Sequence, residues 1–209
     1  MRRAHVGRGG ERTGQGADAR RTGLLNGREQ RMKRILVAGL GNVLMGDDGA
    51  GPHVIAHLQR HYRMPEHITV ADLGTPGLAL TSNILGYDAV ILIDTIKSDG
   101  VPGDIRRYGK GDLERIPVNP RVNPHDPAVG EALLTASFSP DAPSEAVLVG
   151  IVPQRCEYGV GISDAVKNAI PAAAEFVLFD LARLDPSFVP ERIDRAERID
   201  PALAPFVAA

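Results

Sequence analysis

From Arg34 onward, short runs of β-branched and other apolar residues alternate with longer amphipathic stretches. Short apolar runs bounded by turn residues are typical of buried strands, and apolar residues repeating every three to four positions are typical of helices. Their alternation along one chain predicts an α/β fold with a mainly parallel sheet. The expected strands are 35–39, 68–73, 89–94, 104–108 and 147–152, and the expected helices are 52–63, 77–85, 129–138 and a last one from Ser163 to Leu184.

Several segments depart from this regular pattern. The expected strand 104–108 has a more exposed character than the others, and residues 112–127 are expected to be mostly loop. Pro171 is expected to kink or restart the last helix, because proline lacks the amide proton that continues a helix. Residues 186–209 contain four prolines and show no period, so we expect a loosely packed, Pro-rich carboxyl-terminal tail.

The first 31 residues have a composition of their own, with eight arginines and seven glycines but few large apolar side chains. Such a segment buries too little apolar area to offset its chain entropy, so we expect a disordered basic extension. No apolar stretch of a secretory signal is present in it. Either a dispensable extension or a functional arm fits this composition, and the main domain is expected to span residues 32–185.

The composition of 209 residues with 43% hydrophobic content fits one domain with a core of its own. The longest apolar runs are far shorter than the roughly 20 residues that cross a bilayer, so membrane insertion is not expected. Cys156 is the only cysteine, which excludes an intramolecular disulfide and a thiolate cluster and favours the cytoplasm. The net charge is +5 for residues 1–31 and −7 for the rest, which argues against nucleic acid as a partner of the main domain.

Polar residues gather in the loop after the first expected strand, between Gly39 and Gly51. A dinucleotide site would have glycine where Leu44 stands, and the adjacent carboxylates of Asp47 and Asp48 would repel a pyrophosphate, so no nucleotide cofactor is expected. The two acids could simply form the first turn of a helix. Their position after a strand, where open α/β sheets bind ligands, favours a functional role.

Two further aspartates end expected strands. Asp94 follows the apolar run 89–93, where it fits either a catalytic or ligating role or the capping of the next turn. Asp72 precedes the turn 74–77, and we expect its side chain to cap that turn.

The histidines form two sets. His53, His57 and His61 share one face of an expected helix at a spacing compatible with metal binding, but this face is polar, and we interpret it as solvated helix surface. His125 instead stands in a loop between two prolines, just before a helix. Together with Asp48 and Asp94, His125 would offer two carboxylates and one imidazole at the carboxyl edge of the sheet. This set suits a divalent ion of the zinc, nickel or cobalt type, or a polarised water.

These residues resemble the motifs of the hydrogenase maturation proteases, which trim a carboxyl-terminal extension from the large-subunit precursor of nickel-iron hydrogenases. The resemblance covers roughly residues 34–184. It rests on Gly41-Asn42, on Gly46 to Gly49, on Asp72 to Thr75, on Ile93-Asp94, on His125, and on Val149 to Pro153 followed by Gly161-Ile162. It implies a twisted, mainly parallel five-stranded sheet with helices on both faces, and metal binding by the residues matching Asp48, Asp94 and His125.

The resemblance also implies how such a site works. The nickel would be carried by the substrate, the three side chains would complete its coordination, and Asp48 or Asp94 would act as the base. Aspartic-type and metal-assisted hydrolysis both remain open. A non-enzymatic nickel-binding or precursor-binding chaperone is the main alternative. Peptidyl-tRNA hydrolases share a similar Gly-Asn loop, but the acidic main domain argues against an RNA substrate.

Overall fold

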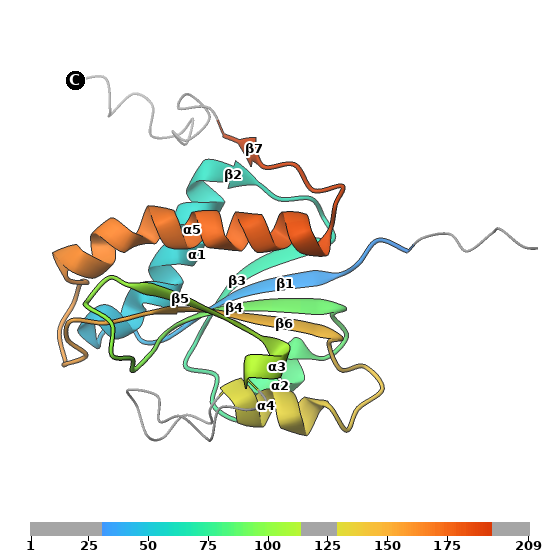
Figure 1. Ribbon diagram of the computed structural model, residues 1–209, viewed down its shortest axis with the longest axis horizontal. Coiled ribbons are helices and arrows are strands. Elements are labelled where there is room, and N and C mark those ends of the chain that lie inside the picture. Colours follow the sequence, from blue (N-terminus) through green and yellow to red (C-terminus); the bar gives the residue numbers. More distant parts are fainter. Residues whose placement is uncertain (1–30, 114–128, 194–209) are drawn as a thin grey trace, which may run out of the picture. The chain divides into compact units, whose positions relative to one another are not determined.

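The computed structural model describes residues 31–113 and 129–193, and its centre is a five-stranded sheet (Figure 1). The strand order is β3-β1-β4-β6-β5, in which all neighbours are parallel except the antiparallel pair of β5 and β6. This confirms the expected mainly parallel sheet, with the more exposed strand at its edge. The strands are β1 (Ile35–Leu40), β3 (Ile68–Gly74), β4 (Ala89–Thr95), β5 (Ile105–Gly109) and β6 (Glu145–Ile151).

Helices cover both faces of this sheet, as Figure 1 shows. Side chains of alternate positions in β1 enter two separate cores, Ile35 and Val37 on one side and Leu36 and Ala38 on the other. Because both faces are buried, the central strands are apolar throughout instead of alternating. The first core packs against α1 (Ala50–His61) and α5 (Asp164–Leu184), and the second against α2 (Ala79–Ile84), α3 (Lys110–Leu113) and α4 (Val129–Ala136).

The helix α3 begins at Lys110 and ends at Leu113, two residues inside the region 112–127 that was expected to be mostly loop, and the rest of that region lies outside the described residues. Four residues are too few to show a helical period, which explains why the pattern missed this element. Within the two described ranges, no helix is long and apolar enough to cross a membrane.

The helix α5 begins where the sequence predicts. The Ser163 hydroxyl accepts a hydrogen bond from the Val166 amide at 3.3 Å, which is the expected cap. The helix continues through Pro171 without interruption to Leu184, so the expected restart is wrong. Ile170 before the proline and Ala173 after it are buried in the core, and this tertiary packing outweighs the local cost of a missing hydrogen bond.

The segment after α5 contains one buried side chain and a short strand. The strand β7 (Glu191–Arg192) pairs with β2 (Tyr62–Arg63) at the end of α1, and the Phe188 side chain is only 5% exposed. The side chains of residues 189–192 are exposed. The sequence pattern did not predict β7, because a two-residue strand carries no recognisable period. The remainder of the predicted tail lies outside the described residues.

The histidines of α1, of which His57 is affected by the charge of Arg192 on β7, lead us to expect a dependence of stability on pH. Burial is the largest cause that lowers the pKa of His57 below 6.5, and the neighbouring His61 and the cations Arg192 and Arg60 act in the same direction, against Glu175. The rings of His57 and His61 lie 4.3 Å apart. A histidine with a lowered pKa stabilises the fold above its unfolded pKa, and this contribution is lost as the pH falls below about 6.5.

The urea concentration at the midpoint of unfolding should therefore be lower at about pH 5.5 than at about pH 7.5. This decrease should be smaller for the His57→Gln variant. An equal decrease in the variant and the wild type would contradict this assignment to His57.

Candidate active site

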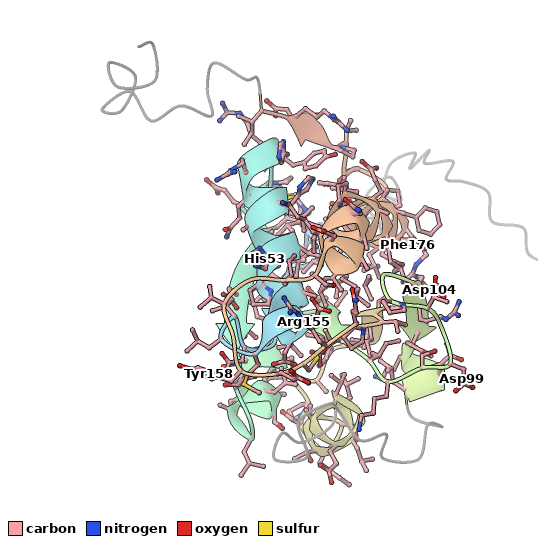
Figure 2. The ribbon with its side chains drawn as sticks, turned by 90° about the vertical axis from the view of Figure 1, so that its left-hand side faces the viewer. His53, Asp99, Asp104, Arg155, Tyr158 and Phe176 are labelled. Carbon is pink, nitrogen blue, oxygen red and sulfur yellow. The ribbon has the colours of Figure 1, made fainter. Side chains whose placement is uncertain are left out.

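The strand order reverses between β1 and β4, since the chain first continues from β1 to β3 on one side and then returns to place β4 on the other. In open α/β sheets the carboxyl ends of the strands at such a switch point are the usual place for a ligand. Asp48 follows β1, and Asp94 is near the end of β4. Both predicted catalytic residues therefore belong to the pair of strands that defines the switch point. Figure 2 looks onto this edge of the molecule.

The loop after β1 packs tightly against the strand ends, and glycines make this possible. Gly41 has a φ of +125°, and a Cβ atom there would lie 1.8 Å from the Asp48 carbonyl oxygen. At Gly51 a Cβ atom would lie 2.3 Å from the Leu40 carbonyl oxygen. Between them, the single 3-10 turn η1 (Gly46–Gly49) carries Asp47 and Asp48. The glycines thus allow the two acids to lie directly over the ends of the strands.

Thr95 connects the two predicted catalytic carboxylates. Its hydroxyl donates to Asp48 Oδ1 at 3.2 Å, and its amide donates to Asp94 Oδ1 at 2.9 Å. The other oxygen of Asp48 accepts a hydrogen bond from the Asn42 amide at 2.8 Å. Asp48 is half-buried, whereas Asp94 is 4% exposed. The structure therefore brings Asp48 and Asp94 to one place, and His125 lies outside the described residues.

Asp47 lies in the turn directly before α1, as the sequence suggested, but its side chain also joins distant parts of the chain. Its carboxylate is fully buried and accepts hydrogen bonds from the amides of Gln154, Arg155 and Ser163 and from the Ser163 hydroxyl. Burial alone would raise its pKa, but these donated hydrogen bonds outweigh burial and lower the pKa of the carboxyl below its usual range. The partners are more than 100 residues away in the chain, so no local pattern could have predicted them.

Cys156 is a second residue that the sequence left without a role. Burial, followed by the charges of Asp48, Asp47 and Asp94, raises the pKa of its thiol to about 12. The side chain is therefore a neutral thiol at pH 7, close to the carboxylates. Nothing in the sequence indicated that this thiol is a neighbour of the candidate carboxylates.

The other sequence candidates lie where structural roles explain them. Asp72 Oδ1 accepts a hydrogen bond from the Gly74 amide at 2.9 Å, which confirms the predicted cap. His53 is exposed on α1, in agreement with a solvated helix surface, whereas His57 and His61 on the same face are half-buried and do not fit that interpretation. Over residues 31–113 and 129–193, no group of three or more His, Cys, Asp and Glu side chains is arranged to hold a metal ion by itself. Asp48 and Asp94 can contribute carboxylate oxygens to an ion that has further ligands of its own.

The fold and the site define an α/β protein whose paired carboxylates lie at the switch point of the sheet. The family model for hydrogenase maturation proteases matches residues 52–179. The Hydrogenase 2 maturation protease of Escherichia coli is 30% identical over 146 residues, which cover 69% of this chain and 88% of that protein. The chain therefore belongs to the hydrogenase maturation protease family and is a peptidase.

Solved structures agree with this assignment. The hydrogenase maturating endopeptidase HybD from Escherichia coli superposes with a TM-score of 0.66 at 26% identity, covering 78% of this chain and 98% of that one. A hydrogenase 2 maturation peptidase from a Thaumarchaeota archaeon gives a TM-score of 0.55 at 31% identity, covering 72% and 99%. The shared fold extends over almost the full length of both relatives.

Proposed function

We propose that this protein is an endopeptidase that removes the carboxyl-terminal extension of a nickel-iron hydrogenase large-subunit precursor after nickel insertion. The observation that carries the proposal is the pair Asp48 and Asp94, both hydrogen-bonded to Thr95 at the carboxyl edge of the sheet. The names of the relatives, which are hydrogenase maturation proteases, support the same substrate class. The free thiol of Cys156 fits a cytoplasmic reaction.

In this proposal the nickel ion belongs to the substrate. Carboxylate oxygens and an imidazole nitrogen are suitable nickel ligands, so Asp48, Asp94 and His125 would complete the coordination of the ion in the precursor. Recognition by oxygen and nitrogen ligands would allow the product to leave with its nickel.

The same carboxylates can serve hydrolysis. Water attacks the carbonyl carbon of the scissile peptide, a carboxylate accepts the proton of that water, and the proton passes to the amine as the carbon–nitrogen bond breaks. Asp48 is the better base of the two because it is half-buried and can meet water, whereas Asp94 is almost fully buried. The hydrogen bonds from Asn42 and Thr95 hold the Asp48 carboxylate in a fixed orientation.

A size-shift assay tests this proposal. Purified protein is mixed with nickel-loaded precursor, and the product is examined by mass spectrometry for loss of the carboxyl-terminal extension. Cleavage supports the endopeptidase. A stable complex without cleavage would favour the alternative, a non-enzymatic chaperone that binds nickel or the precursor.

A further inference from the structure

The loop between β6 and α5, residues 153–163, lies alongside the loop that carries Asp47 and Asp48. Two backbone hydrogen bonds join their middle parts, from the Gly46 amide to the Gly159 carbonyl oxygen at 3.0 Å and from the Gly159 amide to the Leu44 carbonyl oxygen at 2.9 Å. Residues of the 153–163 loop, among them Arg155 and Tyr158, are labelled on the edge shown in Figure 2. The two loops therefore form one layer over the carboxyl ends of the strands.

Asp47 joins the two ends of the 153–163 loop to this layer. Its Oδ2 atom accepts hydrogen bonds from the Gln154 amide at 2.8 Å and the Arg155 amide at 3.0 Å, near the beginning of the loop. At the end of the loop, the Ser163 amide donates to Oδ1 and the Ser163 hydroxyl donates to Oδ2. The Asp47 amide also donates to the Arg155 carbonyl oxygen at 3.0 Å. One buried carboxylate thus satisfies donors from both ends of the loop.

The 153–163 loop has one side near the carboxylates of the site and one side that is exposed. Its inner residue Cys156 lies within the field of Asp48 and Asp94 and is half-buried. Its outer residue Tyr158 is 87% exposed. The loop is therefore one wall of the site, and Asp47 is the group that holds this wall next to the adjacent residue Asp48.

We propose that Asp47 is a positioning residue for peptide cleavage, which holds the 153–163 loop against the turn that carries Asp48. The carboxylate of Asp47 does not react with the substrate, because all of its neighbours are donors from the protein and it is fully buried. The effect on cleavage rests on the function proposed above, whereas the effect on the loop does not.

The Asp47→Asn variant tests the hold on the loop. Asparagine has the same shape, but its amide nitrogen cannot accept a hydrogen bond and would face a protein donor. Hydrogen exchange of the amides of Gln154, Arg155 and Ser163 should become at least about tenfold faster, with exchange in β4 unchanged. The matched control is Asp164→Asn, which changes an exposed acid next to Ser163 and should leave these amides at the wild-type rate.

Cleavage of the nickel-loaded precursor tests the positioning role. For Asp47→Asn we expect kcat to fall at least about tenfold with KM changed less than about threefold, because the wall of the site moves while the precursor still binds. Faster exchange of the loop amides without a loss of kcat would overturn the positioning role. Unchanged exchange would overturn the hold on the loop itself, whatever the activity.

Two further comparisons keep the test decisive. Ser163→Ala removes only the hydroxyl donor to Asp47 and the cap of α5, so it should shift exchange and kcat in the same direction by a smaller factor. If Asp47→Asn fails to fold, Ser163→Ala is used in its place. Wild-type amide exchange and wild-type kcat in Ser163→Ala would then overturn the proposal. If wild-type protein does not cleave the precursor, the proposed function fails, while the exchange experiment still decides whether Asp47 holds the loop.

Discussion

Replacement of Asp48 by asparagine should reduce the rate of precursor cleavage at least about 100-fold, the usual loss when a general base is removed. Asparagine keeps the shape of the side chain, and its carbonyl oxygen can still accept a hydrogen bond from the Asn42 amide or the Thr95 hydroxyl. The fold should therefore survive while the negative charge is lost. Cleavage is measured as the initial rate of product formation, and folding as the midpoint of urea unfolding.

The matched control for this variant is Asp72→Asn. Asp72 also lies near a strand end, but its side chain caps a turn through the Gly74 amide, a role that asparagine performs equally well. This control should cleave the precursor at the wild-type rate. If Asp48→Asn were as active as Asp72→Asn, Asp48 would be neither the base nor a required nickel ligand.

The ion pair of the buried Asp180 with Arg107 stabilises the fold. Asp180 on α5 is fully buried and accepts hydrogen bonds from Arg107 on β5, with Nε to Oδ2 at 2.7 Å and Nη2 to Oδ1 at 2.6 Å. The hydrogen bonding with Asp180 is the main cause that raises the pKa of Arg107, against the effect of burial. Arg183 donates to the same carboxylate at 3.0 Å. This group connects the antiparallel edge strand to the long helix.

The Arg107→Met variant should lose about 3 kcal/mol of the free energy of unfolding, because among the described residues it leaves the buried carboxylate with Arg183 as its charged partner. The double variant Arg107→Met with Asp180→Leu should recover much of this loss, since the unpaired charge is removed. Urea unfolding of the single and double variants measures the loss of the free energy of unfolding and its recovery.

Arg106→Met serves as the control on the same strand. The Arg106 side chain is exposed and pairs with Asp104 at 3.3 Å, so its loss should cost less than about 1 kcal/mol. A loss as small for Arg107→Met as for Arg106→Met would contradict the stabilising role of the buried group.

The regular part of the fold was predictable because it depends on local patterns. Strands buried on both faces are apolar throughout, and this property marked β1, β4 and β6 in the sequence. The cap at Ser163 was also predictable, because its donor is only three residues away. Short elements such as α3 and β7 were not, since their four and two residues are stabilised by contacts with distant parts of the chain.

The candidate site shows the same division. Asp48 and Asp94 could be identified because acids that end or follow buried strands gather at one edge of a parallel sheet. The roles of Thr95 and Asp47 could not be predicted, because they depend on hydrogen bonds between segments that are far apart in the chain. From the sequence, Cys156 only excluded a disulfide and a thiolate cluster and favoured the cytoplasm, whereas in the fold its thiol is close to the carboxylates.

In the proposed function the precursor carries nickel, and Asp48, Asp94 and His125 recognise this ion. The cleavage rates of nickel-loaded and nickel-free precursor are compared under the same conditions, with product formation followed by mass spectrometry. We expect rapid cleavage of the nickel-loaded form and at least about 100-fold slower cleavage of the nickel-free form. Equal rates for the two forms would contradict this recognition of nickel.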